Sequence, residues 1–100
     1  MRKGTTPSFV FELPIEVDTI KNAKVIFSFN NDVKLEKYLK QCAASGNKLT
    51  VKLTQEETFL FECNATVKIQ LRVVTVNGDA LASDVFSVFV HQCLDDEVIE

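Results

Sequence analysis

The sequence has little of what catalysis, nucleotide binding and membrane insertion usually require. No run of 18 apolar residues is present, so a membrane-spanning helix is not expected. The three glycines stand apart at Gly4, Gly46 and Gly78, and no glycine-rich loop can cradle a phosphate through its backbone amides. His91 is the only histidine. We therefore expect no catalytic residues, no cofactor, no membrane and no small-molecule substrate.

The charge distribution excludes another class of partner. The net charge is −3, and the sequence has no stripe of lysine and arginine interleaved with aromatic residues. We therefore expect no nucleic-acid binding. Residues 1–3 are followed by Gly4 to Pro7 rather than by the apolar stretch of a signal peptide, so the chain is expected to stay in the cytosol of the cell that makes it.

Three cysteines are an odd number at irregular spacing, which argues against a disulfide framework. We expect Cys42, Cys63 and Cys93 to be free thiols. Cys63 and Cys93 lie next to apolar strand positions, and unpaired cysteines are often buried, so packing in the core is the expected role of both.

The chain of 100 residues is 46% hydrophobic and 25% charged, as is typical of one globular domain. We assign residues 1–100 to a single domain in which 1–6 and 94–100 are flexible termini. Alternating apolar residues predict strands at 7–13, 23–29 and 49–53, and a third strand starting at Val33 whose pattern weakens over 36–40, where a helical turn could form. Thr54 to Glu57 has the spacing of a capping box and predicts one short helical turn ending near Phe61.

The strongest local signal is a hairpin centred on Asn77-Gly78, the dipeptide most typical of a two-residue type I′ turn. In that register Val76 pairs with Asp79. One face of the hairpin then carries an apolar set that belongs to the core: Val67, Ile69, Leu71 and Val73, facing Val88, Phe86, Asp84 and Ala82. The other face carries Lys68, Gln70, Arg72 and Val74, facing Ser87, Val85, Ser83 and Leu81.

A three-residue loop ending at Asp79 is the alternative register. It would place Leu71 against Val85 and would turn Phe86 and Val88 outward, so apolar matching favours the first register. In the favoured register Asp84 falls on the inner face. Either a β-bulge re-aims this carboxylate, or it is buried and accepts hydrogen bonds.

Together these elements predict an all-β fold, an immunoglobulin-like antiparallel β-sandwich of six to seven strands with one short helical turn that crosses between the sheets. A small barrel is the alternative. The outer face of the hairpin is apolar enough to be covered, either by another part of the chain or by a partner protein. The candidate interface residues are Arg72, Val74, Val76, Leu81, Val85 and Phe89.

A different hypothesis places a small metal site or enzyme at His91 and Cys93. These residues share a face of an extended segment, but one His-x-Cys pair lacks the second paired motif of a zinc site. The expected role is a histidine at the end of a strand beside a packed thiol, with no metal bound.

Several segments carry a resemblance to a known family: residues 1–8, 20–27, 53–59, 69–73, 78–84 and the ending 93–98. In these the chain resembles a family of short proteins encoded in phages and prophages of Gram-positive gut bacteria. More distantly, it is similar to the immunoglobulin-like N-terminal domains of siphophage baseplate proteins. The resemblance covers nearly the whole chain and implies a virion-associated or virion-assembly protein. It supplies no catalytic residues that could be carried over to this chain.

From this we expect a non-enzymatic protein-binding module, a tail or baseplate accessory component of a phage virion. Its partners would be other phage structural subunits or further copies of itself. It would be found in the cytoplasm of the bacterial host and, once assembled, in the virion. The alternative within the same setting is a host-modulating phage protein that binds a bacterial regulator.

Overall fold

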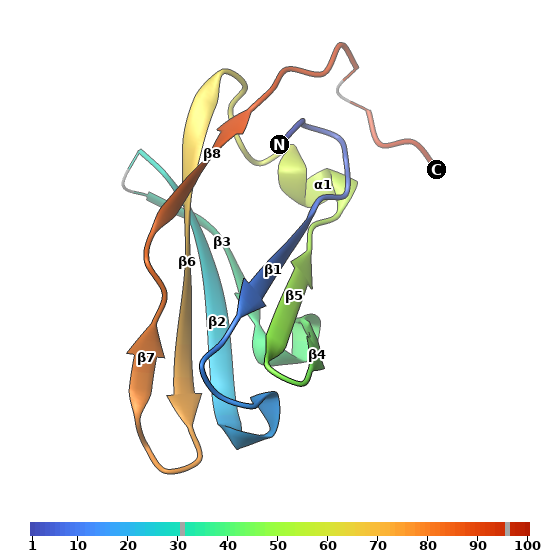
Figure 1. Cartoon of the computed structure of the whole chain (residues 1–100). Coiled ribbons are helices and arrows are strands. Elements are labelled where there is room, and N and C mark those ends of the chain that lie inside the picture. The colour runs from blue at the N-terminus through green and yellow to red at the C-terminus, as the bar shows by residue number, and fades with distance from the viewer. Residues whose placement is uncertain (31, 96) are drawn as a thin grey trace.

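The computed structural model describes residues 1–30, 32–95 and 97–100 (Figure 1). Within these ranges the chain forms eight strands, one α-helical turn and two 3-10 turns. In chain order they are β1 (Ser8–Glu12), η1 (Val17–Thr19), β2 (Ile20–Phe29), β3 (Asp32–Tyr38), η2 (Leu39–Gln41), β4 (Ala43–Ser45), β5 (Lys48–Lys52), α1 (Gln55–Thr58), β6 (Ala65–Thr75), β7 (Ala80–Ala82) and β8 (Phe86–Val90).

The strands form two antiparallel sheets packed face to face. One sheet has the order β1-β5-β4; the other has the order β3-β2-β6-β7, and β8 pairs with β6 further along. The predicted all-β sandwich is confirmed. The strand number differs from the predicted six to seven for two reasons: β4 has three residues, too few to show alternation, and the last predicted strand is divided into β7 and β8.

The core lies between the two sheets and follows the period-two pattern of the sequence. In β6, every second side chain from Val67 to Val73 is buried, and the same holds from Ala23 to Phe27 in β2. The predicted inner set on β6 is therefore confirmed. Each fully buried large side chain, such as Phe27 or Leu71, contributes about 1.5–3 kcal/mol by transfer out of water.

The half of the hairpin that contains β8 has the predicted register. Val67 pairs with Val88, Lys68 with Ser87 and Ile69 with Phe86. This half lies far from the turn, and apolar matching across the strands was sufficient to predict it.

The half next to the turn is shifted by one residue from the prediction. Val74 pairs with Ala80, and the backbone N–H of Thr75 donates to the carbonyl of Asp79 at 2.9 Å, so Val76 to Gly78 form a three-residue loop. The predicted two-residue turn is wrong, and so is the alternative loop ending at Asp79. A type I′ turn needs positive φ at both central residues, whereas only Gly78 has one, at 90°.

A β-bulge joins the two registers. Arg72 pairs with Ala82 and Ile69 with Phe86, so residues 83–85 lie opposite only residues 70–71. The hydroxyl of Ser83 accepts the backbone N–H of Leu71 at 2.9 Å. Asp84 is exposed. Of the two possibilities for this residue, the bulge is confirmed.

The capping box is confirmed. The hydroxyl of Thr54 accepts the backbone N–H of Glu57 at 3.1 Å, and the carboxylate of Glu57 accepts the backbone N–H of Thr54 at 2.9 Å. The helix itself is shorter than predicted and ends at Thr58. Because α1 follows β5 and precedes β6, it carries the chain from one sheet to the other, as expected.

The third strand continues beyond the point where its pattern weakens. β3 runs through Tyr38, and the 3-10 turn η2 follows at Leu39. Lys37 occupies an inner position opposite Val25, which interrupts the apolar alternation that the sequence would otherwise show. Its charge is paired with a residue 20 positions later, which no local pattern indicates.

The first residues of the chain lie beside β8 (Figure 1). The amino nitrogen of Met1 donates to the carbonyl of Phe89 at 2.8 Å, and the backbone N–H of Lys3 donates to the carbonyl of His91 at 3.1 Å. Near the other end, the side chain of Gln55 exchanges two hydrogen bonds with the backbone of Ile99. None of the helical elements in the described ranges has the length and apolar character needed to cross a membrane.

Candidate functional site

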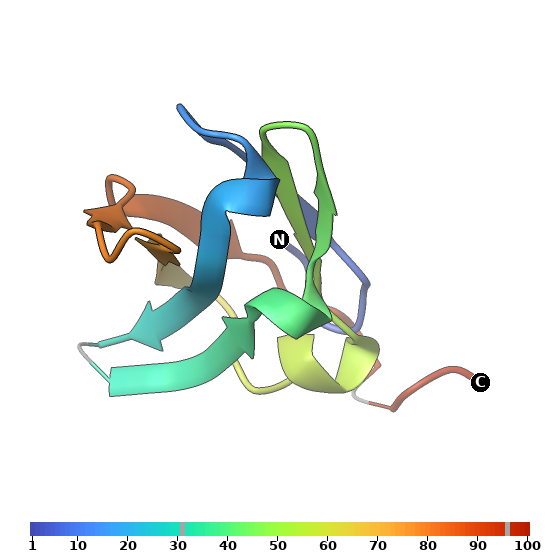
Figure 2. The same cartoon turned by 90° about the horizontal axis from the view of Figure 1, so that it is seen from below.

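The outer face of the five-stranded sheet carries the even-numbered side chains of β6 and their neighbours. Figure 2 shows the three-stranded sheet on one side of the five-stranded sheet, next to β2. Lys24 and Arg72 pair across β2 and β6 and alternate with the buried residues of both strands, so their side chains point to the opposite side. This is the face on which the sequence placed its candidate interface.

The structure brings only two of the six predicted interface residues together on that face. Arg72 and Val74 lie side by side on β6, opposite Ala82 and Ala80. Leu81 pairs with Val73 and points to the inner side, so its predicted position opposite Val74 is wrong. The one-residue difference in loop length moves it to the other face.

The other three predicted residues lie in separate places. Val76 is in the hairpin loop and Val85 is in the bulge, and both are exposed. Phe89 pairs with Thr66, eight positions from Val74 along β6, which corresponds to about 26 Å at the usual rise of a strand. The six residues therefore do not form one continuous patch.

A groove of about 240 Å³ lies around Arg72 and Val74, and we call it the basic groove. It crosses four strands, and its lining combines two cations, an aromatic ring, an amide and small apolar side chains. The lining residues are Asn22, Ala23, Lys24, Tyr38, Arg72, Val73, Val74, Ala80 and Leu81. Lys21 and Lys40 line an adjoining hollow that shares Asn22 and Tyr38 with the groove.

Lys24 and Arg72 lie directly opposite each other on β2 and β6. Like charges in that position destabilise a sheet. Glu36 neutralises one of them, because its carboxylate lies 3.2 Å from the Lys24 ammonium and accepts the Tyr38 hydroxyl at 2.8 Å. Arg72 has no ion-pair partner among the described residues, so the groove keeps a free positive charge.

The groups around Lys24 hold fixed protonation states at neutral pH. The hydrogen bond from Tyr38, followed by the contact with Lys24, lowers the pKa of Glu36 below its usual 4.5. The same hydrogen bond to Glu36 raises the pKa of Tyr38 above 10.0. Glu36 is therefore a carboxylate and Tyr38 a neutral hydroxyl, and the Lys24 ammonium also lies 5.9 Å from the centre of the Tyr38 ring.

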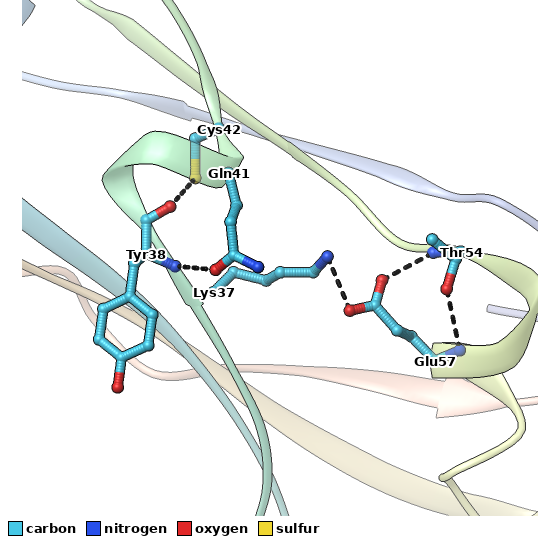
Figure 3. Close-up of polar contacts among 6 residues, drawn as sticks. All are labelled: Lys37, Tyr38, Gln41, Cys42, Thr54 and Glu57. Carbon is cyan, nitrogen blue, oxygen red and sulfur yellow. Dashed lines mark hydrogen bonds and ion pairs between the residues drawn. The ribbon is translucent and has the colours of Figure 1, made fainter.

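A second polar cluster closes the core between β3 and α1 (Figure 3). Lys37 as a whole is only 7% exposed, and its ammonium lies 2.7 Å from the Glu57 carboxylate. Desolvation by burial acts to raise the pKa of Glu57, but the hydrogen bonds and charge of Lys37, with the bonds to Thr54, outweigh it and hold that pKa below 4.5. This ion pair ties β3 to α1, the connection between the two sheets, and has the features of a structural contact.

The cysteines are free thiols, as predicted. Cys42 is half-buried, its thiol donates to the carbonyl of Tyr38 at 3.4 Å, and desolvation raises the pKa of the thiol above 9.0 (Figure 3). Such a thiol is a weak nucleophile at neutral pH. Cys63 is exposed, so the prediction that it packs in the core is wrong: it lies in the turn between α1 and β6 rather than in a strand.

His91 follows the last residue of β8, and its ring forms a T-shaped pair with the Phe89 ring, with 4.9 Å between centroids. Cys93 is half-buried two residues later. Across residues 1–30, 32–95 and 97–100, no group of three or more histidine, cysteine and acidic side chains is arranged to hold a metal ion.

The chain was compared with protein-family models, with curated proteins and with solved structures, and none of them matches it. The basic groove itself was missed in the sequence because Lys24 lies on the predicted strand 23–29, whereas Tyr38 lies in 36–40, where the strand pattern weakens and a helical turn could form. The outward position of Lys24 could have been read from the alternation of Ala23, Val25 and Phe27, but no such local pattern marks that of Tyr38. Their place beside Arg72 depends on the pairing of β2 with β6.

Proposed function

We propose that the protein is a non-enzymatic binding module that docks on an acidic surface of a larger protein through the basic groove. The observation that supports this most directly is the opposed pair Lys24 and Arg72, with Val74 and Ala80 beside it. Glu36 already pairs with Lys24, so an acidic side chain from a partner would pair with the free charge of Arg72, and apolar contacts with Val74 and Ala80 would add to the binding.

We further infer that the sandwich is of the immunoglobulin-like type. The order β3-β2-β6-β8 corresponds to strands C′-C-F-G of such domains, and β1-β5-β4 corresponds to B-E-D, with α1 at the connection from E to F. A fold of this kind supports many functions, so the functional proposal depends on the groove and not on the fold.

The setting of the proposal comes from the resemblance of the chain to phage and prophage proteins. We propose that the protein is a tail or baseplate accessory component and that its partner is another structural subunit of the virion. Further copies of the same chain are a second possible partner, and a bacterial regulator is the partner expected of a host-modulating protein.

Mass spectrometry of purified phage particles tests this setting. A virion component is expected in the particles at a fixed ratio to the tail proteins, and its gene is expected among capsid and tail genes. If the protein is absent from particles in which other minor components are detected, the virion role is wrong. A gene among early genes would then favour the host-modulating role.

The substitution Arg72→Glu tests the groove. Its matched control is Lys68→Glu, which reverses a charge four residues away on the same face of β6 and outside the groove. We expect both variants to keep the circular dichroism spectrum of the parent, and only Arg72→Glu to reduce the amount of protein in particles. Equal amounts for both variants would rule out the groove as the docking surface.

A further inference from the structure

The inner face of the five-stranded sheet is not fully covered on the β7–β8 side. Leu81 pairs with Val73, and Phe86 pairs with Ile69. Val73 and Ile69 are 3% and 0% exposed, but Leu81 and Phe86 on the same face are 41% and 38% exposed. The three-stranded sheet thus leaves part of the apolar inner face beneath β7 and β8 in contact with solvent.

β1 is the strand that borders this uncovered strip. The ring of Phe11 on β1 contacts that of Phe86 on β8, with 5.7 Å between centroids. A slot of about 190 Å³ continues the strip between Leu13, Ile15, Val73 and Leu81. Its volume is below the roughly 300–1,000 Å³ of sites for small molecules, and it is of a size for an inserted side chain.

The free edge of β1 presents unpaired backbone groups towards the same space. Leu13 donates to Asn47 at 2.7 Å and Leu53 donates to Pro7 at 2.9 Å, which places the odd-numbered residues of β1 in hydrogen bonds with β5. In an antiparallel ladder the backbone N–H and C=O groups of the even-numbered residues then point away from β5. The N–H and C=O groups of Ser8, Val10 and Glu12 therefore face outward, and β1 pairs only with β5 in the described chain.

The other sheet edges are protected, fully or in part, in ways that natural proteins commonly use. β3 is bulged and rich in charge, the C-terminal end of the β8 edge is lined by residues 1–3, and β4 and β7 have three residues each. β1 is a regular strand of five residues, and its central side chain, Val10, is 61% exposed.

We propose that a single extended segment of a partner protein adds to β1 as a fourth strand of the smaller sheet. Its backbone would pair with Ser8, Val10 and Glu12, and its inward side chains would be apolar, covering Phe86 and Leu81. This mode of recognition is strand addition, in which the backbone supplies affinity and alternate side chains supply specificity. Its backbone contacts lie on β1, outside the basic groove, although Val73 and Leu81 line both the slot and the groove, and it does not depend on the function proposed above.

A second copy of the folded chain does not fit this position. A symmetric pairing of two β1 edges would continue the smaller sheet across a two-fold axis. The β7 and β8 segments of the two copies would then meet in the space beneath the added strand. A lone segment carries no second sheet and avoids this overlap.

The test uses the full chain and a pool of synthetic peptides of about ten residues, the upper range of ordinary strand length, with Val, Ile, Leu or Phe at alternate positions and Ser, Thr or Lys between them. We expect the tightest binders to slow amide hydrogen exchange at Ser8, Val10 and Glu12. Binding that protects amides elsewhere, or no binding from the pool, would overturn the proposal.

The variant Val10→Pro removes one outward N–H from β1 without touching the ladder to β5, and an edge strand tolerates proline at such a position. Its matched control is Val10→Thr, which keeps the N–H. We expect Val10→Pro to weaken peptide binding about tenfold and Val10→Thr to leave it nearly unchanged. Equal binding by both variants would contradict the proposal. Phe86→Ser, at an exposed position outside the basic groove, provides a second test if Val10→Pro does not fold, and unchanged peptide binding by this variant would contradict the proposal.

Discussion

The strand register of the C-terminal hairpin is set by different interactions in its two halves. Where β6 pairs with β8, three apolar side chains from each strand meet on the inner face, and their matching sets the register. Where β6 pairs with β7, the loop sets it: a three-residue loop with Gly78 in the left-handed region shifts the pairing by one. The bulge at residues 83–85 accommodates both. Core packing and turn geometry can thus disagree within one hairpin when an extra residue lies between them.

The largest expected effect comes from breaking the half that packing controls. Ile69 is fully buried opposite Phe86, so Ile69→Ala should lower the free energy of unfolding by about 2–5 kcal/mol. Urea denaturation would measure this. A typical domain is stable by only about 5–15 kcal/mol, so the variant should be close to unfolding. A loss below about 1 kcal/mol would mean that this half does not depend on packing.

The next effect comes from the half that the turn controls. Gly78 has φ of 90°, and a Cβ added there meets no atom within 4 Å, so Gly78→Ala tests backbone conformation alone. We expect a loss of about 1–2 kcal/mol in the same denaturation experiment. Asn77→Ala, at a position without positive φ, is the control and should cost less. Equal costs would argue against the three-residue loop.

The third effect does not distinguish the two halves of the hairpin. Acid should lower the stability of the whole domain, because it breaks the ion pair of Lys37 and Glu57, which lies outside the hairpin. The pKa of Glu57 is lower in the folded chain than its usual 4.5, so the pair stabilises the fold above that pH. This contribution is lost as the pH falls below 4.5, and we expect it to be about 1 kcal/mol or less. Denaturation at several pH values should show a larger loss in the parent than in Glu57→Gln, which keeps the ion pair of Glu36 and Lys24.

The smallest expected change in stability comes from removing the bulge. Deleting Asp84 removes one residue from 83–85, so that β7 and β8 become one strand while every pairing on either side is kept. The free energy of unfolding should change by less than about 1 kcal/mol. Deleting Ser87 also gives one strand but turns Phe86 outward and Val85 inward, and it should cost more. A larger loss for the Asp84 deletion would show that the bulge itself is needed.

Much of the fold followed from local sequence patterns. The alternation in β1, β2, β5 and β6, and the capping box at Thr54, act through neighbouring residues and were visible in the chain. The end of β3 was not, because Lys37 breaks the alternation and its partner is distant in sequence. Of the candidate site, Arg72 and Val74 were found, but Lys24 and Tyr38 join them only through strand pairing.

By itself the sequence determined which side chains of β1, β2, β5 and β6 face the core, because a strand alternates faces at every residue; in β7 the shifted register reversed the predicted faces. It also determined that Asp84 was out of place in a continuous strand. Only the tertiary structure decided which strands lie side by side, and therefore that Lys24 faces Arg72 and that β1 leaves the strip at Leu81 and Phe86 open. Such arrangements arise from contacts between segments far apart in the chain. The sequence of a single segment therefore does not determine the order of strands in a sheet.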